Sequence, residues 1–165
     1  MSKFDELCQA YADSRKAYMD YRDTCFAFAQ SLVEALIRYL EVPEGQIGFV
    51  PVNREPDPAA LYTLPGAMHL DEDTFWHFGV VITLADPSGA CPPQTVLLKL
   101  QLKQHEDAFG VRLGQDDEDF WVRPGHPQEM AAFMDHVFGA VKGSYERGLQ
   151  QFLDQASTRK IGFSE

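Results

Sequence analysis

Cysteine is scarce in this sequence, and long apolar runs are absent from it. The three cysteines, Cys8, Cys25 and Cys91, are far apart among 165 residues. We therefore expect reduced thiols, and neither a disulfide framework nor a zinc site built from closely spaced cysteine pairs. No stretch reaches the roughly 18 apolar residues of a membrane span, and the first residues lack the apolar segment of a signal peptide. These absences predict a cytoplasmic protein with no membrane partner.

Basic residues are also few. The chain has 14 Lys and Arg against 25 Asp and Glu, a net charge of −11, and residues 42–126 hold 5 basic and 13 acidic residues, a net charge of −8. Such a surface repels a phosphate backbone, so nucleic acid is not an expected partner. The acidic run Asp116–Asp119, next to two aromatic residues, leaves two interpretations open: a solvated turn, or a docking point for a basic protein partner.

The familiar catalytic motifs are missing. The sequence has no Walker-type phosphate loop, no dinucleotide-binding glycine pattern and no G-x-S-x-G nucleophile motif. Cys8 and Cys25 fall on a helical apolar stripe, where a small core residue is the simpler role. We therefore name no catalytic residue and expect no cofactor, and a non-enzymatic role is favoured over an enzymatic one.

What is present first is a long helical pattern over residues 3–41. Apolar side chains recur at helical spacing, and no Gly or Pro interrupts them before Pro43. A helix of that length spans about 58 Å, whereas a compact domain of this size is on the order of 40 Å across. The helix is therefore expected either to break, near Asp13 or Asp23, or to pack its first half against another molecule, most simply a second copy. The recurring residues are Phe4, Leu7, Tyr11, Tyr18, Tyr21, Cys25, Phe28, Leu32 and Tyr39.

Residues 46–123 have the pattern of short strands separated by turns. Apolar and polar side chains alternate, which is typical of an antiparallel sheet with one face buried and the other in water. On the clearest strand, Trp76, Phe78 and Val80 are expected to share one face, with His77 on the other. The strand segments are residues 46–52, 74–84, 95–103, 109–113 and 120–123.

Apolar residues at helical spacing return after Pro127. They predict a second long helix over residues 127–155, followed by a tail at 157–165. Residues 1–165 are thus expected to form a single α+β domain. In it, an antiparallel β-meander of about four to six strands packs against the N-terminal and C-terminal helices.

One face of the first helix is a candidate contact surface for a partner or a second copy. Its arginines either bind a carboxylate or phosphate through their guanidinium forks, or lay their stems over apolar surface and pair with neighbouring Asp residues. The second interpretation is favoured. The residues of this face are Tyr11, Arg15, Tyr18 and Arg22.

A pocket between the sheet and the helices is the alternative site. It would belong to a small-molecule-binding or enzymatic α+β domain, and aromatic and polar side chains would converge in it. The expected lining residues are Trp76, His77, Trp121 and Tyr145.

A metal site is considered and not predicted. His69 and Asp71 are suitable ligand types, but with His77 they form no recognised spacing, and the path from loop to strand is expected to separate His77 from the other two. A surface histidine beside the acidic turn 71–73 is the favoured interpretation.

The sequence as a whole favours a non-catalytic protein-binding or regulatory module that forms a homodimer through its N-terminal helix. Two alternatives stay open. One is the ligand-binding or enzymatic domain described above. The other is a secretion-chaperone or immunity-type protein, which rests only on size, acidity and the helix–sheet–helix order.

Overall fold

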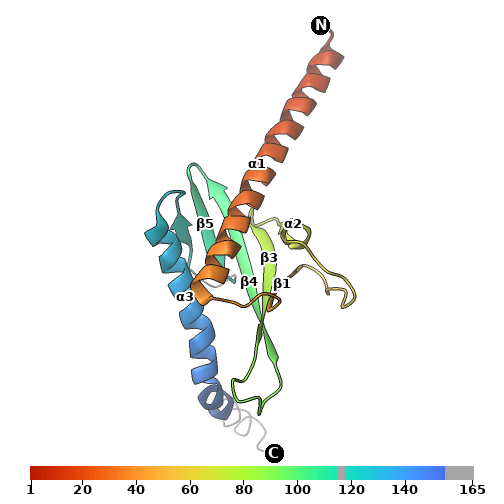
Figure 1. The fold of residues 1–165 in the computed structure, drawn as a ribbon. Helices are drawn as coiled ribbons and strands as arrows, with labels where there is room; N and C mark the ends of the chain where they lie inside the picture. The colour runs from red at the N-terminus through yellow and green to blue at the C-terminus, as the bar shows by residue number, and fades with distance from the viewer. Residues whose placement is uncertain (115–117, 155–165) are drawn as a thin grey trace, which may run out of the picture.

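An antiparallel sheet with two long helices packed on one face makes up the computed structural model, which describes residues 1–114 and 118–154 (Figure 1). The predicted α+β class is confirmed. Within the predicted acidic docking point, residues 116 and 117 lie outside the described residues, as does the tail 157–165. In chain order the elements are α1 (Lys3–Leu40), β1 (Ile47–Val50), α2 (Leu64–Ala67), β2 (His69–Leu70), β3 (Trp76–Leu84), β4 (Gln94–His105), β5 (Ala108–Leu113), β6 (Phe120–Val122) and α3 (Pro127–Glu146).

The sheet is built around β3. Its strand order is β1-β3-β4-β5-β6, and the short strand β2 pairs with β3 on the side that β1 occupies. All pairs are antiparallel, and β3 to β6 form the predicted meander. Side chains alternate between the faces of a strand, so Trp76, Phe78 and Val80 all enter the core, as expected. The helices complete that core with Cys25, Phe28, Ala29, Leu32, Val33 and Leu36 of α1 and Phe133, Met134 and Val137 of α3.

Helix α1 is continuous over its 38 residues, so the break considered near Asp13 or Asp23 does not occur. Ser2 and Asp5 form a capping box at its start, which supplies hydrogen bonds that the first turn of a helix lacks. At the other end, Glu41 adopts a left-handed conformation, with φ 53°, and ends the helix. Without Gly or Pro between these caps, nothing in the chain interrupts the helical backbone.

Helix α3 is shorter than predicted. It ends at Glu146 with Arg147 as its cap, and helical residues resume at 148–154, so the single helix expected over 127–155 is wrong. The Arg147 guanidinium folds back over Gly143, where a Cβ would lie only 2.8 Å from it. Gly148 follows at once, and glycine weakens a helix by about 1 kcal/mol relative to alanine. The interruption thus falls next to a glycine.

Sequence analysis missed two short elements, the helix α2 and the two-residue strand β2. Strand β2 pairs with β3 so that His69 lies opposite His77. The connecting residues 71–75 form a tight turn, closed by a hydrogen bond of 3.0 Å from the Thr74 amide to the Asp71 carbonyl. Thr74 has φ 70°, a position that usually carries Gly or Asn in such hairpins. The sequence predicts an acidic turn at 71–73, but Thr74 gives no signal for the left-handed position, so the pairing of β2 with β3 was not predicted.

Replacing Thr74 with Asn is expected to raise the free energy of unfolding by about 0.5–1 kcal/mol, because Asn tolerates the left-handed backbone that strains a β-branched residue. Chemical denaturation measures the change. The matched control is Thr95→Asn, at an exposed position of β4, where no stabilisation is expected. A loss of stability in Thr74→Asn would contradict this account of the turn.

Candidate functional site

The first half of α1, residues 3–20, projects beyond the sheet, and we call it the overhang (Figure 1). All of its residues are exposed except Met19, which is half-buried. Phe4, Leu7 and Tyr11 have exposed fractions of 72%, 70% and 69%. Large apolar side chains exposed side by side are typical of a contact surface.

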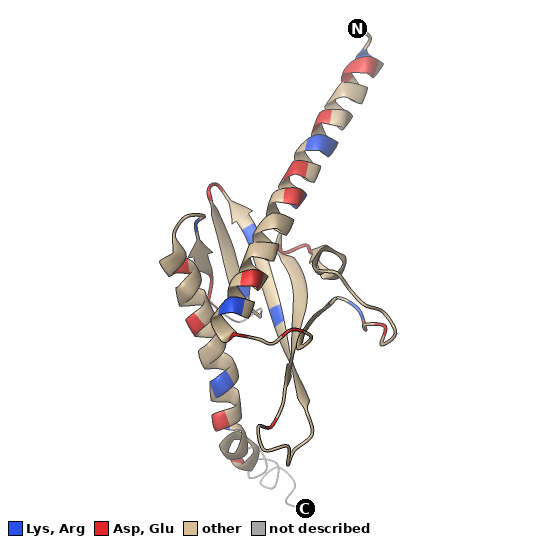
Figure 2. Cartoon of the chain, viewed as in Figure 1, with Lys and Arg blue, Asp and Glu red and all other residues tan. Residues whose placement is uncertain are grey.

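The overhang carries little net charge. It has three basic and four acidic residues, so only −1 of the total charge of −11 lies on it. Figure 2 shows the two signs interspersed along this part of α1. Two overhangs therefore do not repel one another strongly, although the body of the protein is strongly acidic.

The predicted contact face lies on and next to the overhang. Tyr11 and Tyr18 are both exposed there. The Arg15 guanidinium lies 5.5 Å from the centre of the Tyr18 ring. Arg22 pairs with Asp23 at 3.1 Å and lies over a phenylalanine ring. Both arginines thus contact groups of their own helix, and the two do not converge on one ligand.

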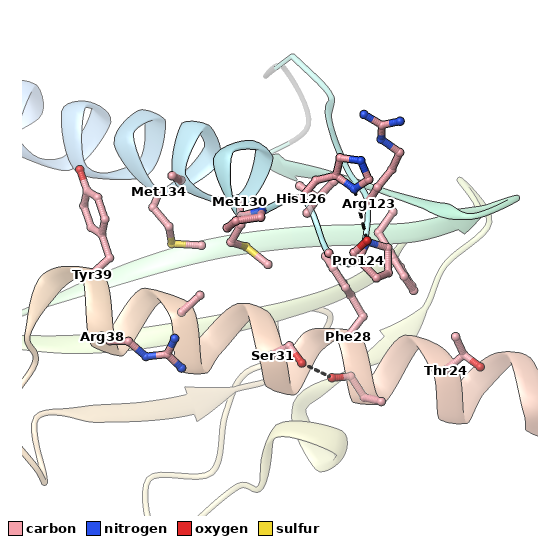
Figure 3. A pocket seen from close by; sticks show the side chains of 17 residues that line it. Thr24, Phe28, Ser31, Arg38, Tyr39, Arg123, Pro124, His126, Met130 and Met134 are labelled. Carbon is pink, nitrogen blue, oxygen red and sulfur yellow. Dashed lines mark hydrogen bonds between the residues drawn. The ribbon is translucent and has the colours of Figure 1, made fainter.

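An open groove separates the second half of α1 from the first turns of α3 (Figure 3). Its volume is about 760 Å³. Phe28 stacks on Phe109 at its base, with ring centres 3.9 Å apart and planes nearly parallel. Met130 and Met134 of α3 point across the groove toward α1 in Figure 3. The groove therefore offers an apolar floor and flexible apolar walls.

The hydroxyl groups of the groove already have partners within the chain. Thr24 donates to the Asp20 carbonyl at 2.9 Å, and Ser31 donates to the Ala27 carbonyl at 3.2 Å. The Tyr39 hydroxyl donates to Asp135 of α3, and this hydrogen bond to a carboxylate raises the pKa of Tyr39. Such a lining suits apolar contact better than polar recognition or catalysis.

The groove differs in charge from the rest of this acidic protein. Among the described residues that line it, Arg38, Arg123 and His126 are basic and none is Asp or Glu. Arg123 pairs with Glu129 at 3.1 Å. Arg38 makes no ion pair or hydrogen bond with a described residue. The groove thus has a positive group available at the end formed by the last turns of α1.

The four residues predicted to line one pocket are not brought together, so that prediction is wrong. Trp76 is in the core, whereas His77, the next residue of β3, points to the opposite face of the sheet. Trp121 is on that opposite face and lies over Gly110, where a Cβ would be 3.2 Å from its ring. Tyr145 borders a separate hollow of about 330 Å³ between α3 and the ends of α1, β3 and β4.

The sheet face expected to lie in water is not fully wet. His77 and Gln101 are buried there, with exposed fractions of 5% and 3%. Arg112 donates to Gln101 at 2.6 Å, and Asp73 contacts both Arg112, at 3.4 Å, and the His77 ring, at 2.9 Å. The turn 71–75 thus folds a carboxylate over this face, and the expectation that His77 lies apart from His69 and Asp71 is wrong.

Sequence analysis missed the groove, although some of its residues were visible as part of helical stripes. Phe28 belongs to the apolar stripe predicted over residues 3–41, and Met130 and Met134 belong to the stripe predicted after Pro127. The angle at which α1 and α3 diverge leaves a gap beside them, and no local pattern encodes that angle. The only sequence signal for these groove residues was that their side chains are apolar.

Comparison of the chain with protein-family models, with curated proteins and with solved structures gave no match. Within residues 1–114 and 118–154, none of the helices combines the length and the hydropathy needed to cross a bilayer.

Replacing Asp73 with Asn is expected to lower the free energy of unfolding by about 1 kcal/mol at neutral pH, because the contacts to His77 and Arg112 lose their charge. Burial raises the pKa of Asp73, but the hydrogen bonds from His77 and from the Phe75 amide outweigh it, so the pKa lies below its ordinary value. A lowered pKa stabilises the fold above the unfolded-state pKa of about 3.9, and this stabilisation disappears as pH falls through the folded-state value.

The difference between wild type and Asp73→Asn should therefore shrink below about pH 4. Urea denaturation across a pH series measures it, with Asp107→Asn, at an exposed position in the β4–β5 turn, as the control. A difference that stays constant down to the lowest pH would show that the ionised carboxylate is not the stabilising group.

Proposed function

We propose that this protein is a non-catalytic protein-binding module that self-associates through α1. The observation that carries the proposal is the exposed apolar stripe of the overhang. Phe4, Leu7 and Tyr11 follow the same helical spacing as the residues that form the core further along α1, at Cys25 and Leu32. The stripe is thus a core-type surface with nothing in its own chain to cover it among the described residues.

The occupant we assign to the stripe is the groove of a second copy. Phe4, Leu7 and Tyr11 stand at positions i, i+3 and i+7, the spacing by which an amphipathic helix anchors in an apolar groove. The groove supplies aromatic and methionine side chains for them. Each copy would then give one helix and receive one, as a two-fold axis requires.

The length of α1 suits such an exchange. Two α1 helices that lie antiparallel about their midpoint, between residues 21 and 22, place each overhang beside the second half of the other helix. Phe4 of one copy is then opposite Tyr39 of the other, and Cys8 is opposite Ala35. Both Tyr39 and Ala35 line the groove. Both the stripe and the groove become covered in a single contact.

Charge favours the same register. Asp5 and Glu6 of one copy fall opposite residues 38 and 37 of the other, and Arg38 is the groove residue with no ion pair to a described residue. An acidic helix start also reaches a lining without Asp or Glu among its described residues. Opposite charges at the ends of the contact fix its direction more than they add to its affinity.

The proposal includes a reducing compartment such as the cytoplasm. Cys8 and Cys91 are exposed and Cys25 is buried, and none of the three is paired in a disulfide. Free exposed thiols are ordinary where thiols are kept reduced.

Replacing Tyr11 and Tyr18 with Glu is expected to weaken self-association at least about 100-fold, because each copy then brings two charges into an apolar contact. Light scattering coupled to size exclusion measures the mass. Wild type should have twice the 18.6 kDa chain mass at high micromolar concentration, and the variant should have the chain mass.

The matched control is Gln9→Glu with Ala17→Glu, which adds the same charge at two exposed positions of the overhang. In the antiparallel register these positions fall opposite residues 34 and 26, neither of which lines the groove. This control should remain dimeric. A monomeric wild type at high micromolar concentration, or equal weakening by both pairs of substitutions, would overturn the proposal.

A further inference from the structure

His69, Asp71 and His77 meet at one point on the sheet face opposite the helices. The hairpin register places the two histidines opposite each other, with ring centres 5.2 Å apart. Asp71 Oδ2 lies 3.9 Å from His77 Nε2. One ligand-type atom from each of the three residues lies within 4.8 Å of the other two.

One ring nitrogen of His69 is buried and lacks a hydrogen-bond partner among the described residues. This atom is Nδ1, and buried polar atoms without a partner are rare in folded proteins. Burial and, next, the charge of His77 lower the pKa of His69, and Arg54 acts in the same direction. Asp71 and Asp73 oppose them only in part. Imidazole binds metals through an unprotonated ring nitrogen.

In the turn, one oxygen of each carboxylate accepts a hydrogen bond from a backbone amide. Asp71 Oδ1 accepts from the Glu72 amide at 2.8 Å, and Asp73 Oδ1 accepts from the Phe75 amide at 3.0 Å. Asp71 Oδ2 lies 3.9 Å from His77 Nε2. Both oxygens of Asp73 lie near the same nitrogen, Oδ1 at 3.0 Å and Oδ2 at 2.9 Å. Backbone bonds of this kind orient metal ligands in known sites.

We propose that His69, Asp71 and His77 bind one divalent transition-metal ion of the zinc class, with Asp73 as a fourth donor. Two imidazoles with carboxylates suit zinc, whereas calcium and magnesium prefer oxygen ligands alone. The ion takes the position between His77 Nε2 and Asp73 Oδ2, where a hydrogen bond of 2.9 Å lies in its absence. The two carboxylates balance the charge of the ion.

The donor atoms of His69, Asp71 and His77 lie within 4.8 Å of one another, so the ion has to draw them closer to form a tetrahedral site. Metal–ligand bonds of about 2.0–2.1 Å set the donor atoms roughly 3.4 Å apart. The Asp73 contact at 2.9 Å is shorter than this, and the Asp71 contact at 3.9 Å is longer. The Asp71 side chain is 50% exposed and is free to close the gap. Arg112, 3.4 Å from Asp73, is the cation that competes with the ion for that carboxylate.

Metal titration of the full chain tests the site. Protein stripped with a chelator is titrated with Co²⁺, followed by absorption in the visible range, and with Zn²⁺, followed by calorimetry. We expect one ion per chain, an absorption band typical of four-coordinate Co²⁺, and release of the Co²⁺ on addition of Zn²⁺.

The test variants are His69→Ala and Asp71→Asn, because both side chains are partly or largely exposed, whereas His77 is buried in the sheet. Each should weaken Zn²⁺ binding at least tenfold while circular dichroism stays unchanged. His105→Ala, at an exposed histidine of β4, is the control and should bind as wild type does. Wild-type binding no tighter than that of the double variant His69→Ala/Asp71→Asn, or equal loss in the control, would overturn the proposal and leave a metal-free His77–Asp73 ion pair.

Discussion

The packing of Phe28, Leu32 and Leu36 against the sheet determines where α1 lies, and the other features of the surface follow from it. These side chains tie only the second half of a 38-residue helix to the body. Helix α1 is capped and has no internal Gly or Pro, so it continues beyond the sheet. Its first half is therefore exposed to solvent, and its apolar stripe is uncovered. Because α1 and α3 diverge on the same sheet face (Figure 1), a groove opens beside this second half of α1. The exposed stripe and the groove therefore both result from the way the second half of α1 packs on the sheet.

The opposite face of the sheet obeys a different constraint. No helix of the described residues covers it, yet His77 and Gln101 are buried because a short hairpin folds carboxylates over them. That hairpin places Thr74 in a left-handed conformation. Backbone strain of this sort is retained where the surrounding structure over-determines it, often at binding sites. The strained turn and the cluster of His69, Asp71 and His77 thus belong to the same local arrangement.

Long periodic segments were predictable from the sequence. α1 and the paired strands β3 and β4 each carry an amphipathic pattern over many residues, and their buried faces were identified correctly. The end of α3 was not predictable, since it depends on an Arg147 side chain that folds over Gly143. The hairpin β2–β3 was missed because Thr74 occupies a position where Gly or Asn is the usual signal.

The candidate sites were less predictable than the fold. The contact face on α1 was predicted because the amphipathic helix indicated by the sequence is longer than a domain of this size is wide. The groove depends on the angle between α1 and α3, and the histidine cluster depends on a register, His69 opposite His77, that no local pattern shows. Trp76 and His77 could not share a pocket, because neighbours on a strand point to opposite faces.

Thiol cross-linking tests most directly whether each overhang lies in the groove of a second copy. The antiparallel register places Cys8, which is exposed, opposite Ala35 of the other copy, and Ala35 lines the groove. Within one helix these positions are about 40 Å apart, whereas helices in contact have axes about 8–10 Å apart. A short bismaleimide applied to Ala35→Cys, in a Cys91→Ser background, should therefore give a dimer joined from Cys8 to position 35, detected by peptide mass spectrometry. Glu34→Cys, the neighbouring position outside the groove lining, should give little. Equal linkage at both positions, or none at position 35, would contradict the exchange of overhangs.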